Sequence, residues 1–134
     1  VQDARGRKAR GCDLAFTNPE AVEIEEQIPG GGRDLVVLRV AGVVPWLVMK
    51  GMALAERVKE KDAYDVYVAV RNYPGGIQAL AEAFRADLGH TLVREGLSKI
   101  RKAFLSVDHV GPNTIVSQNH RPPLGRGREP SQVT

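Results

Sequence analysis

The fold of this chain is decided by residues 43–73, which read VVPWLVMKGMALAERVKEKDAYDVYVAVRNY. Apolar side chains recur in this stretch at intervals of three and four residues, as in Trp46, Met49 and Ala53. This spacing is typical of helices that bury one side. The stretch therefore predicts two helices, the first reaching to about Lys59 and the second opening at Asp62.

Helical spacing continues beyond this stretch. The segment Asn72-Tyr73-Pro74-Gly75-Gly76 is a strong stop signal for the second helix. A third helix is expected over residues 77–88. A fourth is expected over residues 91–105, where Gly96 costs a little helix stability. The core face of this fourth helix is predicted from its periodicity as Val93, Leu97, Ile100 and Phe104.

Before residue 43 the sequence has the pattern of strands. Residues 14–17 form a short apolar segment, and residues 22–28 alternate apolar with charged side chains, which predicts a half-buried strand. Residues 29–32, Pro-Gly-Gly-Gly, permit a tight reversal into the apolar run over residues 35–41. We therefore expect an α+β fold. A small β-hairpin or mixed sheet at about residues 12–41 is followed by about four helices at residues 44–106.

The composition fits one ordinary domain, because the 134 residues are 43% hydrophobic and 26% charged. We expect a folded domain over residues 11–116, between a basic arm at residues 1–10 and a disordered tail at residues 117–134. Both ends are rich in arginine, whereas the segment between them is slightly acidic, although the whole chain carries a net charge of +3. Such ends either hold nucleic acid electrostatically or are simply solvated.

Several classes of protein are disfavoured. The apolar run over residues 40–49 is shorter than the roughly 20 residues that a membrane span needs. Cys12 is the single cysteine, which rules out a disulfide within the chain and a multi-thiolate zinc site. We therefore expect a cytoplasmic protein without a membrane partner. Because the chain begins with Val1, we also expect it to be a fragment or a processed form of a longer protein.

The charged residues of the helical stretch are the candidates for a functional site. Lys50 and Arg57 are seven residues apart, so they project from nearly the same line of a helix and can grip one anion. Lys50 is surrounded by apolar neighbours and needs water or a negative partner. Asp62 and Asp65 share a face of the next helix, where Asp62 suits a cap. The alternative is ion pairing at the helix junction, with Arg57 bonded to Glu60 or Asp65.

These residues carry a resemblance to a known family. The chain is similar over residues 35–73 to the C-terminal half of the AbiEii/AbiGii family of nucleotidyltransferase-like toxins. In that family a lysine-bearing helix is followed by a basic-Asp-x-x-Asp-hydrophobic-Tyr segment. The matching residues are Pro45, Met49-Lys50, Ala53-Leu54, Arg57 and Lys61-Asp62-Ala63-Tyr64-Asp65-Val66-Tyr67.

The resemblance implies a minimal nucleotidyltransferase fold. It implies transfer of a nucleotidyl group from a nucleoside triphosphate to an RNA or protein acceptor, with Mg²⁺ as cofactor and an antitoxin as partner. Carried over to this sequence, Lys50, Asp62 and Asp65 belong to the catalytic site, with Lys50 contacting the triphosphate. Arg57 and Lys61 bind the substrate beside it.

One part of the family pattern is missing from this sequence. The family binds its metal ions with an Asp-x-Asp pair after a Gly-Ser turn, and neither motif is present. Asp13 is the candidate for an isolated metal ligand, on a strand, but one carboxylate does not replace the pair. The sequence therefore predicts a partial nucleotidyltransferase-like domain that is inactive by itself. The alternatives are a non-catalytic module for protein interaction or self-association, and a nucleic-acid binder that uses its basic arms.

Overall fold

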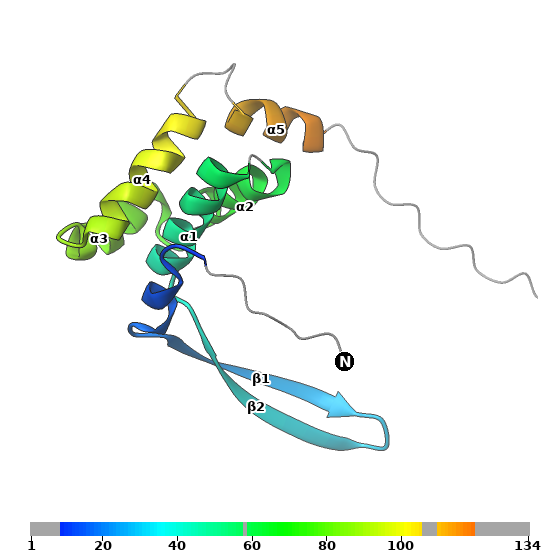
Figure 1. Cartoon of the computed structure of the whole chain (residues 1–134). Helices are drawn as coiled ribbons and strands as arrows, with labels where there is room; N and C mark the ends of the chain where they lie inside the picture. The colour runs from blue at the N-terminus through cyan, green and yellow to red at the C-terminus, as the bar shows by residue number, and fades with distance from the viewer. Residues whose placement is uncertain (1–8, 58, 106–109, 120–134) are drawn as a thin grey trace, which may run out of the picture.

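The computed structural model describes residues 9–57, 59–105 and 110–119. It confirms the α+β fold, with an antiparallel hairpin followed by a cluster of helices (Figure 1). The elements in chain order are the 3-10 helix η1 (Cys12–Phe16), β1 (Glu20–Ile28), β2 (Gly32–Val40), α1 (Val43–Glu56), α2 (Glu60–Arg71), α3 (Gly76–Asp87), α4 (Thr91–Ala103) and α5 (Val110–Asn119).

The helices α1 to α4 lie close to their predicted bounds, but α5 was not predicted. Its sequence lacks apolar periodicity, yet its first turn tolerates Pro112, whose missing N–H has no intrahelical partner there. The helix packs against α2. It includes residues 117–119, at the start of the segment for which the sequence predicts disorder. Residues 1–8 and 120–134, which hold most of the predicted arm and tail, lie outside the described residues.

The first predicted strand is a 3-10 helix instead. Gly11 has a φ of 86°, which turns the chain before η1, and the Leu14 N–H donates to the Gly11 carbonyl over 3.2 Å. This short helix packs against α1. Asp13 therefore lies on an exposed turn rather than on a strand.

The core is built around α1. Leu47, Val48 and Met52 are the largest fully buried side chains. α1 crosses α4 so closely that a Cβ added to Gly51 would lie 2.4 Å from the carbonyl oxygen of Gly96. Gly96 therefore belongs to the buried face of α4, beside Val93, and permits the closest helix contact of the fold.

The hairpin is not half-buried as the alternation predicted. Every residue of β1 and β2 is exposed, and Figure 1 shows the ribbon extending away from the helices. Nine residue pairs join the strands, from Glu20 opposite Val40 to Ile28 opposite Gly32. The reversal uses Gly30 and Gly31 at φ of 110° and 96°, values that favour glycine. Alternation therefore predicted the strands correctly but not their burial.

Candidate functional site

Two cations and two carboxylates meet where α1 ends and α2 begins. The Nζ of Lys50 lies 2.9 Å from Oδ1 of Asp62 and 2.7 Å from Oδ2 of Asp65. The Nε of Arg57 lies 3.1 Å from Oδ2 of Asp62. Asp62 is thus shared by both cations, and these four residues are called the junction cluster below.

The local structure of the two helices brings the cluster together. Arg57 is the residue that ends α1, and Lys59 precedes the first turn of α2. This short connection turns the first residues of α2 back toward α1, so that Asp62 faces Lys50. The ammonium of Lys50 also lies 5.5 Å from the ring centroid of Trp46, a favourable cation–π distance.

Burial makes Asp62 the centre of the cluster. Its side chain is 4% exposed, compared with 21% for Lys50 and 49% for Arg57. Burial raises the pKa of Asp62, but the hydrogen bond from Lys50 and the charges of Lys50 and Arg57 outweigh this effect and lower the pKa below its ordinary 3.8. Burial also lowers the pKa of Lys50, and the bonds to Asp65 and Asp62 outweigh it and raise the pKa above 10.5. Asp62 and Lys50 are therefore both charged at neutral pH.

Several contacts of the predicted site residues differ from those that the sequence predicts. Lys61 is exposed and makes no hydrogen bond or ion pair with the described part of the chain. Asp13 has a weak contact with the Cys12 thiol, at 3.6 Å, and no contact with the junction cluster. Asp62 is not a helix cap, because its carboxylate binds Lys50 and Arg57 in place of a backbone N–H. Arg57 therefore pairs with Asp62, and not with Glu60 or Asp65 as the alternative expected.

The junction cluster retains some capacity for an anion. An ammonium has three N–H donors, and Lys50 uses two of them for the carboxylates. The side chain of Arg57 is half exposed, and its guanidinium has further donors beyond those that reach Asp62. The ion pairs hold both cations in place. A phosphate group would be met by donors that are already oriented.

The metal that the resemblance implies does not fit this cluster. Among residues 9–57, 59–105 and 110–119, no group of three or more His, Cys, Asp or Glu side chains is arranged to hold a metal ion. Asp62 and Asp65 are also engaged with Lys50. We therefore derive no reaction step through Mg²⁺ from these residues.

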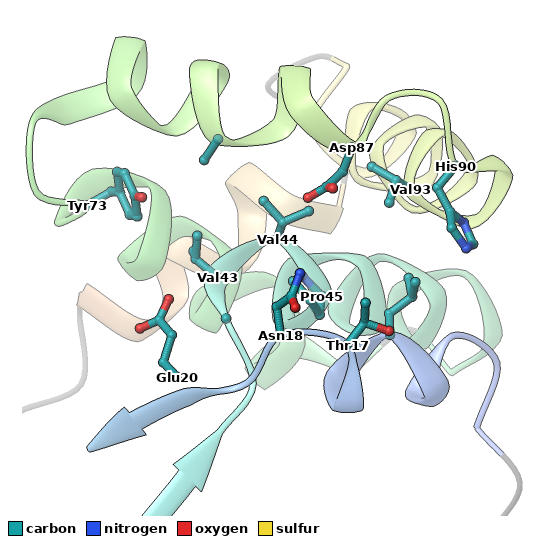
Figure 2. A pocket seen from close by; sticks show the side chains of 13 residues that line it. Thr17, Asn18, Glu20, Val43, Val44, Pro45, Tyr73, Asp87, His90 and Val93 are labelled. Atoms are coloured by element: carbon teal, nitrogen blue, oxygen red, sulfur yellow. The ribbon is translucent and has the colours of Figure 1, made fainter. Parts of the chain in front are cut away.

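A pocket of about 420 Å³ lies elsewhere, at the base of the hairpin (Figure 2). Figure 2 shows Tyr73 on one side of the pocket and His90 on the other, with Glu20 nearer to Tyr73 and Asp87 nearer to His90. Pro45 and the neighbouring apolar residues of α1 line it as well. Sequence reasoning missed this pocket because its residues come from η1, β1, α1, α3 and α4 and have no common spacing.

Among the described residues of the basic arm, Arg10 makes a side-chain contact with α4. Arg10 binds Glu95 with two nitrogens, at 3.0 Å and 2.7 Å. The hydrogen bond from Arg10, together with the one from Lys99, lowers the pKa of Glu95 to about 2. Arg10 is therefore ion-paired with Glu95 on α4. No observation on the described residues favours nucleic-acid binding by this arm.

Comparison with known proteins finds no matching family model, no similar curated protein and no similar solved structure. No helix formed by the described residues is long and apolar enough to cross a lipid bilayer. The function is therefore argued from the geometry of the junction cluster and of the hairpin.

Proposed function

We propose that this chain is a partial nucleotidyltransferase-like domain that contributes cationic groups to a triphosphate site. The junction cluster is the observation that carries the proposal. Lys50 is mostly buried and uses two of its three donors for the carboxylates, and the Arg57 side chain beside it is half exposed. The family resemblance predicts these residues as a site, whereas periodicity leaves ion pairing at the helix junction as the alternative.

The cluster suits a polyanion for physical reasons. Arg57 presents a planar fork of N–H donors, a geometry that matches phosphate oxygens. Lys50 supplies a compact positive charge whose position is fixed by Asp62 and Asp65. Lys61, which is exposed at the start of α2, provides a further cation that a bound triphosphate attracts. In this proposal the two carboxylates position the cations and do not bind the nucleotide.

The transfer reaction needs more than these residues. The Asp pair that the family uses for its metal ions is not in this sequence, so transfer depends on carboxylates from another polypeptide segment. By itself the chain binds the triphosphate without transferring it. An antitoxin partner, an RNA or protein acceptor and a cytoplasmic location belong to this proposal through the resemblance.

Nucleotide binding tests the proposal directly. We expect ATP or GTP to bind, and Lys50→Gln and Arg57→Gln each to weaken binding by about tenfold or more, equivalent to roughly 1.4 kcal/mol. Lys102→Gln is the control, because Lys102 is exposed on α4. Titration calorimetry measures the affinities, and far-ultraviolet circular dichroism checks that the variants fold. Equal affinities for the wild type, the two cluster variants and the control would reject the proposal.

The matching test in a complete protein uses the reaction. Where a polypeptide supplies the missing carboxylates, Lys50→Ala should abolish nucleotidyl transfer. Unchanged transfer in this variant contradicts the assignment of Lys50.

The exposed hairpin favours a second candidate function, a non-catalytic module for protein interaction or self-association. An isolated two-stranded ribbon is marginally stable in water, yet this ribbon leaves many large apolar side chains exposed. Light scattering of the chain alone and with its co-purifying proteins tests this candidate. A lone monomer under both conditions would count against it.

A further inference from the structure

One face of the hairpin is apolar along most of its length. Paired residues of an antiparallel ribbon share a face, and successive residues alternate between faces. The register therefore places six large apolar side chains on one face, each of them 39–48% exposed. They are Val22, Ile24, Ile28, Val36, Leu38 and Val40. The opposite face is mixed, because Glu23, Glu25, Arg33 and Arg39 share it with two exposed apolar side chains, Leu35 and Val37.

The charges on the apolar face all have the same sign. The face carries Glu20, Glu26 and Asp34 and no cation. Glu26 lies directly opposite Asp34, a cross-strand pairing that is unfavourable between like charges. Neither of these two carboxylates has an ion-pair partner in the described part of the chain. They border a hollow of about 240 Å³ whose apolar wall includes Ile24, Ile28 and Val36.

The other end of this face leads into the pocket at the base of the hairpin. Glu20 belongs to the apolar face by register and also lines that pocket, together with Asp87 (Figure 2). The face therefore has carboxylates at both ends and apolar side chains between them. Six residues of strand separate Glu20 from Glu26, a distance of roughly 20 Å.

We infer that this face binds an extended segment of another protein, apolar in its middle and carrying Lys or Arg at both ends. One cation of the segment lies between Glu26 and Asp34, and the other lies near Glu20 and Asp87. This inference rests on the second candidate function and gives the chemistry of the partner. It does not depend on nucleotide binding at the junction cluster.

Charge also decides against a second copy of this chain as the occupant. Two copies stacked face to face about a two-fold axis would place carboxylates against carboxylates, because the face contributes no cation to neutralise them. A basic segment instead relieves the repulsion between Glu26 and Asp34. It also covers apolar side chains that nothing in the described residues covers.

Synthetic peptides provide the test. The probe is a fluorescein-labelled peptide of about eight residues, in which valine and threonine alternate between two terminal arginines. The matched probe has glutamate in place of both arginines. We expect the arginine peptide to bind at least about tenfold more tightly than the glutamate peptide in fluorescence anisotropy, and to weaken as salt is added.

Paired variants locate the binding face. Glu26→Gln combined with Asp34→Asn should weaken the arginine peptide by about tenfold, and Ile24→Thr with Val36→Thr should abolish its binding. The control is Glu23→Gln with Glu25→Gln, which removes the same charge from the opposite face and should change affinity less than about twofold. Far-ultraviolet circular dichroism and thermal unfolding confirm that each variant keeps its fold.

Each contrary result overturns the inference in its own way. Equal binding of the two peptides, or equal weakening by both charge-removing pairs, contradicts the assigned face. A dimer that sedimentation equilibrium detects, and that Ile24→Thr disrupts, assigns the face to a second copy. If neither peptide binds while light scattering shows a complex, the interaction function stands and this face is not its site. If neither peptide binds and the chain is a lone monomer, both fail.

Discussion

At the scale of single residues, Asp62 has the most consequential surroundings. Its carboxylate is nearly inaccessible to water and accepts hydrogen bonds from both Lys50 and Arg57. A buried carboxylate is tolerated only when its oxygens have partners, and here cations supply them. Asp62 therefore links the end of α1 to the start of α2 whether or not a nucleotide binds.

Removal of this charge should destabilise the fold. We expect Asp62→Asn to lower the free energy of unfolding by about 1.5–3 kcal/mol, because Lys50 and Arg57 lose their shared acceptor while Lys50 stays mostly buried. Urea denaturation followed by circular dichroism measures the change. Asp13→Asn is the control and should change stability by less than about 0.5 kcal/mol, since Asp13 is exposed. Equal effects of the two variants would contradict this account of Asp62.

The sequence predicted the members of the junction cluster better than their pairing. The three-residue spacing of Asp62 and Asp65 was enough to place both on one face of α2, where both reach Lys50. The seven-residue spacing assumed that Arg57 continues the helix of Lys50, whereas Arg57 follows the end of α1 with a φ of −140°. Which carboxylate receives both cations depends on the direction of the backbone between the helices, which spacing does not encode. The position of Lys61 is explained by helix geometry. One residue before Asp62 on a helix is a rotation of about 100°, so Lys61 lies on a neighbouring, exposed face and pairs with neither carboxylate of the cluster.

At the scale of the elements, the crossing of α1 and α4 depends on two glycines. Sequence reasoning treated Gly96 as a small cost to helix stability, because a helix contact between two distant segments is not visible in local spacing. In the structure an added Cβ on Gly96 would lie 2.9 Å from the Cα of Val48. The absence of a side chain is therefore required for the packing of α4 on α1.

Gly96→Ala should therefore destabilise the protein despite the better helix propensity of alanine. Overpacking of this kind costs about 1–3 kcal/mol, more than the roughly 1 kcal/mol that alanine gains in a helix. Gly89→Ala is the matched control, because nothing lies within 4 Å of a Cβ at Gly89. Thermal unfolding compares the two variants. A Gly96→Ala protein as stable as the wild type would contradict the close crossing.

The hairpin is a second case in which local sequence pattern predicted an element but not its packing. Alternation of apolar and charged residues predicted β1 and the turn at residues 29–32, because strand geometry is local. Burial of the strand was not predictable, because it depends on whether another element covers the apolar face. Neither face is covered by a described element.

Hydrogen exchange should show that the hairpin, which no described element covers, is less protected than the helices. We expect the amides of β1 and β2 to exchange with an opening free energy close to zero, whereas amides of α1 near Val48 exchange only through global unfolding. Amide exchange measured by mass spectrometry or nuclear magnetic resonance resolves the two regions. Addition of the arginine peptide should slow exchange in β1 and β2 alone. Equal protection of strands and helices in the free protein would contradict the exposed hairpin.

At the scale of the whole molecule, Arg10 and Glu95 join parts of the chain that are 85 residues apart. Arg10 precedes η1, and Glu95 lies on α4, where Lys99 also reaches it at 2.8 Å. The contact ties the beginning of the described chain to a helix near its end. The low pKa of Glu95, about 2, follows from these bonds.

This low pKa predicts how stability depends on pH. A carboxylate whose pKa falls from 4.5 in the unfolded chain to about 2 in the folded one stabilises the fold above pH 4.5. The contribution is lost as the pH falls from about 4.5 to about 2. Glu95→Gln should therefore flatten the loss of stability over this range, as measured by urea denaturation at several pH values. Glu82→Gln, in an exposed ion pair with Arg85, is the control. A variant that keeps the wild-type acid profile would contradict the role of Glu95.

The two outer edges of the ribbon leave backbone N–H and C=O groups free of any strand in the described residues. Such edges are templates on which further strands can stack into cross-β fibrils. Four glutamates on β1 and the arginines of β2 place charge along these edges. These charged side chains therefore act as gatekeepers, and a hairpin in which apolar residues replace them is expected to seed cross-β fibrils.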